Sequence, residues 1–96
     1  VNTLGYASHS LALGKPDRHM DPFRIEFAAD GVNEDSSHEG EELIICLDGE
    51  VELSYGNGKT VLKPGDTAYY NSVVKHSLKA LGGNPASIYG VVFMPF

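Results

Sequence analysis

The 96-residue sequence predicts an all-β protein of the barrel or jelly-roll kind. Roughly eight short β-type runs follow one another, with Gly, Pro or Asn turn signals about every six to twelve residues. No window of about ten or more residues places its apolar side chains at helical spacing. A flat sheet of this many short strands would leave long unpaired edges, and closure into a barrel removes them.

The N-terminal 21 residues carry the weakest signals. Residues 11–13, Leu-Ala-Leu, are expected to form a short strand that Gly14 and Pro16 stop. We expect residues 1–21 to serve as an N-terminal arm or as edge strands of the barrel.

The clearest strand of the first half covers residues 22–28. Phe23, Ile25 and Phe27 alternate with charged residues, which is typical of a strand with one buried face. Asp30-Gly31 ends this strand, and residues 32–37 are expected to form a polar loop.

The second half of the chain predicts six more short strands. Each is rich in β-branched, aromatic or alternating residues, and turns such as Asp48-Gly49, Gly56-Asn57-Gly58 and Pro64-Gly65-Asp66 separate them. The expected strands cover residues 42–47, 51–55, 60–62, 67–70, 76–81 and 86–93.

The length predicts a single domain over residues 1–96. A chain this short buries only about 60–65% of its unfolded surface, so its stability depends on barrel closure, on a metal ion or on a partner subunit. We expect a homodimer for the same reason, and because the fold supplies many β edges. A first residue of Val1 rather than Met is typical of a processed product or of a piece of a longer chain.

Composition and charge narrow the function classes. The net charge is −6, from 7 basic and 13 acidic residues, and the basic residues are scattered singly. A nucleic-acid face needs clustered positive charge, so we expect no direct contact with DNA or RNA. The longest apolar run covers residues 43–47, too short to span a membrane. The single Cys46 lies in that run, is expected in the core, and fits a cytoplasmic protein.

His38 and Glu42 raise a geometric question. Residues four apart on a straight strand are separated by about 13 Å, whereas two ligands of one metal ion each lie about 2 Å from it. A bend over residues 39–41 would bring the two side chains together, and Gly40 makes such a bend inexpensive. No other motif indicates catalysis: there is no phosphate loop and no Ser-His-Asp arrangement with supporting spacing.

Two motifs together resemble those of the cupin superfamily. His38, three residues, Glu42, six residues and Gly49 match the later part of the first cupin motif. Pro64-Gly65-Asp66, followed about ten residues later by His76, matches the second. The resemblance extends over roughly residues 22–94. It implies the cupin fold, which is a double-stranded β-helix or jelly-roll barrel.

The resemblance also implies a metal site made of His38, Glu42 and His76. Many cupins have a further histidine, which would fall at Ser36 here. Two histidines and one carboxylate are the ligand set of non-haem Fe(II) oxygenases, and among cupins the set is similar to that of hydroxypropylphosphonate epoxidase. These ligands suit a divalent Fe, Mn, Ni or Zn ion, so the metal stays open. The alternative is a cupin whose site is empty or vestigial.

Three functions are consistent with this reading. The His-x-Gly-Glu-Glu run that starts at His38 is similar to that of the C-terminal cupin domains of XRE-type transcription regulators. That likeness implies a small-molecule sensor, the regulatory domain of a larger bacterial protein. The alternatives are a stand-alone metal-dependent oxygenase, epoxidase or isomerase, and a dimeric scaffold without a ligand. Two roles are open to four of the tyrosines, lining a pocket or packing, and packing is the commoner role of aromatic residues in small barrels; the four are Tyr55, Tyr69, Tyr70 and Tyr89. His9 and His19 have no motif context.

Overall fold

The computed structural model describes residues 5–94 and folds them into eight β-strands. Within these residues no helix is present, so the all-β prediction is confirmed. The strands are β1 (Tyr6–Ser10), β2 (Met20–Phe27), β3 (Glu41–Asp48), β4 (Val51–Tyr55), β5 (Gly58–Leu62), β6 (Thr67–Asn71), β7 (His76–Ala80) and β8 (Ala86–Phe93).

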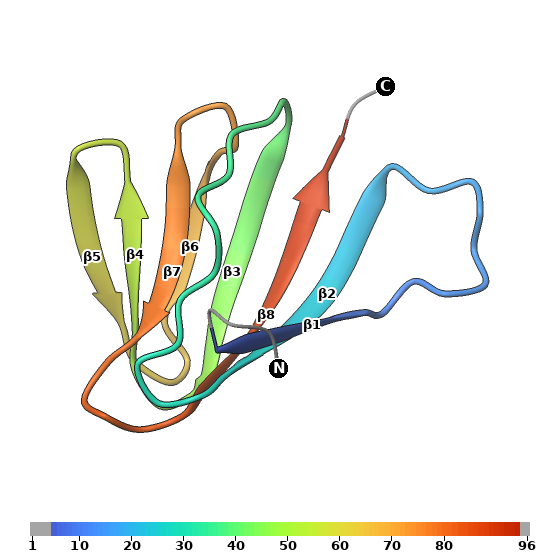
Figure 1. The fold of residues 1–96 in the computed structure, drawn as a ribbon. Helices are drawn as coiled ribbons and strands as arrows, with labels where there is room; N and C mark the ends of the chain where they lie inside the picture. Colours follow the sequence, from blue (N-terminus) through green and yellow to red (C-terminus); the bar gives the residue numbers. More distant parts are fainter. Residues whose placement is uncertain (1–4, 95–96) are drawn as a thin grey trace.

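The strands form two antiparallel sheets that face each other, as Figure 1 shows. One sheet has five strands in the order β1-β2-β8-β3-β6, and the other has three in the order β5-β4-β7. Strands that are distant in sequence lie side by side, such as β2 with β8 and β3 with β8. This pairing is the jelly-roll architecture that the motifs implied.

The predicted strand at residues 11–13 is wrong. The first strand lies earlier, and Tyr6 to Ser10 pair with Phe27 to Phe23 of β2. Leu11 makes one further hydrogen bond, from its N–H to the carbonyl of Pro22. Proline has no N–H to donate in return, so the ladder ends there. The chain then leaves the sheet, and Leu13 is 86% exposed.

The inner faces of the two sheets enclose one apolar core. Ile44 on β3, Ile88 on β8 and Val51 on β4 are completely buried. Phe23 packs across the sheet against Gly90, where any side chain would overlap its ring. The remaining buried apolar residues are Ile25, Phe27, Cys46, Leu53, Leu62, Leu78, Ala80 and Ala86.

The segment over residues 32–37 was expected to be a loop, and it has a structural role. It follows the free edge of β7 through two isolated bridges, Val32 with Lys79 and Ser36 with His76. Asn33 makes two hydrogen bonds with Leu78. The Asn33 N–H donates to the Leu78 carbonyl at 3.1 Å, and the Leu78 N–H donates to the Asn33 side-chain oxygen at 2.7 Å. The segment therefore acts as an irregular fourth strand of the smaller sheet.

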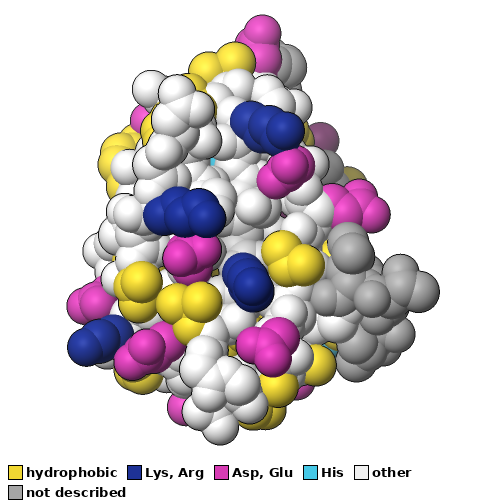
Figure 2. Space-filling model, turned by 60° about the vertical axis from the view of Figure 1, so that its left-hand side comes forward, with side chains coloured by type: hydrophobic (Ala, Val, Ile, Leu, Met, Phe, Trp, Pro, Cys, Tyr) yellow, Lys and Arg dark blue, Asp and Glu magenta, His cyan; other side chains and the backbone are white. Residues whose placement is uncertain are grey.

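Charged side chains of both signs are interspersed on the face shown in Figure 2, where β5 and β4 come forward. Ion pairs such as Lys59 with Glu52, at 3.9 Å, join these strands across the surface. That face shows no continuous basic patch, which agrees with the scattered Lys and Arg of the sequence. Among the described residues, no helix has the length and apolar character needed to cross a membrane.

Candidate metal centre

Glu42 enters the barrel interior from the start of β3. Its inward direction follows from strand alternation, because it shares a face with the buried Ile44 and Cys46. The residue is only 5% exposed. A buried carboxylate needs partners that replace water, and three side chains supply them.

The bend that the sequence predicted lies at Gly40. Its φ of +109° is in the region that favours glycine, and a Cβ there would overlap the carbonyl oxygen of Phe93. Two backbone hydrogen bonds anchor the bend to Ser72. The His38 N–H donates to the Ser72 carbonyl at 3.0 Å, and the Ser72 N–H donates to the Gly40 carbonyl at 2.9 Å. The bend therefore turns His38 back toward Glu42.

His38 and His76 both meet the same oxygen of Glu42. The Nε2 atoms of His38 and His76 each lie 2.9 Å from Glu42 Oε1. The other ring nitrogens face backbone carbonyls: His76 Nδ1 is 2.7 Å from the Val74 oxygen, and His38 Nδ1 is 3.1 Å from the Glu39 oxygen. Because a carbonyl only accepts, each Nδ1 carries the proton. Nε2 is therefore the ring atom through which each histidine meets Glu42.

This arrangement fits a divalent cation. One ligand atom from each of His38, Glu42 and His76 lies within 4.8 Å of the others. Ligands about 2.1 Å from a shared ion, at roughly right angles to each other, lie about 3 Å apart. Three converging electron pairs repel each other unless a cation or a proton lies between them. The Nδ1 hydrogen bonds are also the outer contacts that orient metal-binding histidines.

Tyr70 belongs to the site, whereas the sequence favoured a packing role for it. Its hydroxyl donates to Glu42 Oε2 at 2.8 Å, and β6 places it directly opposite Glu42 on β3. Burial, followed by the Glu42 charge, raises the pKa of the Tyr70 hydroxyl well above its ordinary value. Tyr70 therefore stays a neutral donor and holds the second carboxylate oxygen. Only knowledge that β3 pairs with β6 would have identified it.

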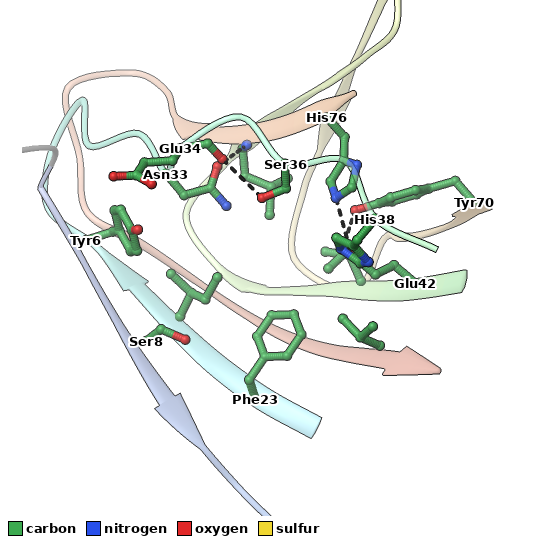
Figure 3. A pocket seen from close by; sticks show the side chains of 14 residues that line it. Tyr6, Ser8, Phe23, Asn33, Glu34, Ser36, His38, Glu42, Tyr70 and His76 are labelled. Atoms are coloured by element: carbon green, nitrogen blue, oxygen red, sulfur yellow. Dashed lines mark hydrogen bonds and ion pairs between the residues drawn. The ribbon is translucent and has the colours of Figure 1, made fainter. Parts of the chain in front are cut away.

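A cavity of about 270 Å³ adjoins the three residues. Figure 3 shows His38, Glu42, Tyr70 and His76 at one side of it. Apolar side chains cover much of the rest, and Ser36, where many cupins have another histidine, also lines it. The apolar lining residues are Phe23, Ile25, Ile44, Leu78 and Val92.

The other titratable candidates lie elsewhere. His9 is on edge strand β1, 3.9 Å from Glu26, and both side chains are largely exposed. Cys46 is buried in the core, as the sequence predicted. Burial, followed by Asp66 and two other nearby carboxylates, raises the pKa of its thiol. Cys46 is therefore a neutral core residue.

The sequence matches the family model described as cupin domain, over residues 23–93. The chain belongs to the cupin family. Cupins commonly bind metal ions, and the structure brings His38, Glu42 and His76 together in one cluster of possible ligands. A search of curated protein sequences gives no significant match.

Solved structures show the same fold at low sequence identity. The cupin domain of an XRE family transcriptional regulator from Enterobacter cloacae is 18% identical, with a TM-score of 0.87 over 96% of this chain and 99% of that one. An HTH_3 family transcriptional regulator from Vibrio cholerae is 21% identical, with a TM-score of 0.83 over 97% and 53% of the two chains. Oxalate oxidase in complex with the substrate analogue glycolate is 17% identical, with a TM-score of 0.84 over 97% and 53%. This chain thus spans about half the length of the last two proteins.

Proposed function

We propose that this cupin binds one divalent metal ion through His38, Glu42 and His76. The carrying observation is the convergence of two histidine Nε2 atoms on one buried carboxylate oxygen, 2.9 Å from each. When bound, the ion supplies a Lewis-acid centre for an oxygen-bearing small molecule in the adjoining cavity. The three side chains hold and orient it, and Tyr70 fixes the carboxylate.

Metal titration of chelator-stripped protein tests the site. Isothermal titration calorimetry with Mn²⁺, Fe²⁺ under anaerobic conditions, Ni²⁺ and Zn²⁺ is expected to show one ion per chain for at least one metal. His38→Ala and His76→Ala are expected to lose this binding. His9→Ala is the matched control, because His9 lies on an exposed edge strand outside the cluster. Equal metal affinity in wild type and His38→Ala would refute the assignment.

We propose that the domain senses a small molecule as the cytoplasmic regulatory part of a larger bacterial protein, such as a transcription regulator. Support comes from the cavity beside the metal cluster and from the shared fold of regulator cupin domains. Because the basic residues of this chain are scattered, we expect another domain of the larger protein to contact DNA. We expect the genomic sequence upstream of the Val1 codon to encode a helix-turn-helix domain. A start codon directly before it would contradict the proposal.

A metal-dependent enzyme is the second candidate. The observation in its favour is that, among the described residues, three side chains form the cluster, and three protein ligands leave coordination positions for a substrate. An oxygenase, epoxidase or isomerase acting on a small polar molecule would fit. Oxygen consumption or substrate conversion by metal-loaded protein, lost in His76→Ala, would favour this candidate. Binding of a ligand without turnover would favour the sensor.

We also propose a homodimer that forms through the outer face of the five-stranded sheet. Aligned apolar side chains stay exposed there, on β2, β8, β3 and β6. Sedimentation at micromolar concentration is expected to give a dimer, and Leu43→Lys, at the centre of that face, is expected to give a monomer. A monomeric wild type would contradict this proposal. The exposed residues are Met20, Leu43, Tyr69, Tyr89 and Phe93.

A further inference from the structure

The cavity beside the metal cluster has a second polar end. Figure 3 shows Tyr6, Asn33 and Glu34 on the side opposite His76 and Glu42, with Phe23 between the two groups. One end therefore offers metal ligands, the middle offers an apolar wall, and the far end offers a carboxylate. A ligand that fills the cavity contacts all three parts.

The carboxylates that line the cavity are not balanced by lysine or arginine side chains. No lysine or arginine is among the residues that line it, and its two carboxylates are Glu34 and Glu42. Glu42 is engaged by two histidines and by Tyr70. Within the described residues, Glu34 lies in no ion pair with a lysine or arginine. A negative group at the far end would meet the Glu34 charge without a cation to compensate it.

The backbone on both sides of Glu34 is held in place. Asn33 exchanges two hydrogen bonds with Leu78, and Ser36 exchanges two backbone hydrogen bonds with His76, each at 2.9 Å. The residue between these anchors therefore keeps its position beside the cavity. The Glu34 side chain itself is exposed, so its carboxylate stands at the open end of the cavity.

We propose, on the basis of the metal-dependent function above, that the cavity selects a short molecule with opposite chemistry at its two ends. An oxygen donor such as a carboxylate binds the metal, a few methylene groups pack against Phe23 and Ile25, and an ammonium group faces Glu34. The cavity volume of about 270 Å³ limits the ligand to a small metabolite. Dicarboxylates of the same length are rejected, because their second charge meets Glu34.

Three four-carbon acids test this selection. Full-length chain loaded with Mn²⁺ is titrated calorimetrically with 4-aminobutyrate, butyrate and succinate, which share the metal-binding carboxylate and differ at the far end. The expected order is 4-aminobutyrate tightest and succinate weakest, with steps of about threefold, the size of a partly exposed charge interaction. Succinate binding at least as tightly as butyrate, or no binding of any of the three, overturns the proposed ligand class.

Glu34→Gln is expected to abolish the order, bringing the three affinities within about twofold of one another. Glu50→Gln is the matched control, because it removes the same charge from an exposed residue that does not line the cavity. An unchanged order in Glu34→Gln would overturn the role of Glu34. Failure of Mn²⁺ to bind refutes the metal site and this selection together, whereas Mn²⁺ binding with the wrong order refutes the selection alone.

Discussion

Two neighbouring Glu–Tyr pairs lie on opposite faces of the same sheet. Tyr69 donates to Glu41 on the outer face, and Tyr70 donates to Glu42 on the inner face. The two pairs contain the same groups and come from the same two strands, β3 and β6. In the outer pair Tyr69 is 69% exposed, whereas in the inner pair Glu42 is 5% exposed. One pair therefore lies in water and the other in the barrel.

The difference shows that burial and neighbours decide what a Glu–Tyr pair can do. The hydrogen bond to Glu41 is the main cause that raises the pKa of Tyr69, while burial is the main cause for Tyr70. Only the inner carboxylate meets two histidines. We therefore expect equivalent substitutions in the two pairs to have very different effects on metal binding.

The largest contrast is expected between Glu42→Gln and Glu41→Gln. Loss of the only carboxylate in the cluster is expected to weaken metal affinity by more than about a hundredfold, because even outer contacts of metal ligands are worth ten- to a hundredfold. Glu41→Gln is expected to leave affinity within about twofold of wild type. Calorimetric titration of both variants measures the contrast, and similar losses in both would contradict it.

Gly40→Ala is expected to remove one histidine from the inner pair. Alanine is strained at a φ of +109°, and its Cβ would overlap the Phe93 carbonyl. We expect a loss of about 3 kcal/mol in unfolding free energy, from backbone strain and the shifted chain. In the folded fraction, metal affinity is expected to fall at least about tenfold as His38 moves away.

Gly65→Ala is the control for that bend. Gly65 also has a positive φ, +90°, but no atom lies within 4 Å of the position of a Cβ. Its substitution is expected to cost about 1–2 kcal/mol in urea unfolding and to leave metal affinity unchanged. If the two alanine variants unfold at the same urea concentration, the close approach to Phe93 is not what makes Gly40 necessary.

Tyr70→Phe and Tyr69→Phe compare the two hydroxyl groups directly. Removal of the Tyr70 hydroxyl leaves Glu42 Oε2 without its donor, so metal affinity is expected to fall about tenfold. The outer Tyr69→Phe variant is expected to bind metal as the wild type does. Circular dichroism of both variants checks that the fold is retained. Unchanged affinity in Tyr70→Phe would show that the histidines alone position the carboxylate.

The smallest effect is expected at Cys46, on the same inward face as Glu42 but beyond the cavity. Because its folded pKa is raised, the folded state keeps the thiol neutral at pH values where the unfolded chain ionises. Stability from this group is present below the unfolded pKa of about 8.5 and is lost as pH rises above it. Urea unfolding between pH 7 and about 9.5 is expected to show a steeper decline for wild type than for Cys46→Ala. The difference is limited to about 1.4 kcal/mol per pH unit, and parallel curves would contradict it.

Sequence patterns predicted most strands because side-chain alternation and turn residues are local signals. The strand over residues 86–93 was predicted with the bounds it has, and His38, Glu42 and His76 were predicted to meet. Local patterns in the sequence do not indicate which distant strands pair with each other. Packing was the favoured role for Tyr70, because its place opposite Glu42 depends on the contact of β3 with β6. The segment at residues 32–37 has loop composition, yet backbone hydrogen bonds to β7 hold it in place.

The three cluster residues come from structurally separate parts of the chain. Glu42 belongs to the five-stranded sheet and His76 to the three-stranded sheet, while His38 lies in the segment between β2 and β3 that runs along β7. An ion that binds all three is a cross-link between the halves of the barrel. It would stabilise the closed form by about 2.7 kcal/mol at a hundredfold excess over its dissociation constant. The melting temperature of this small protein is therefore expected to rise with metal occupancy. The edge of the fold that the ion would hold in place is β7, because β7 carries His76.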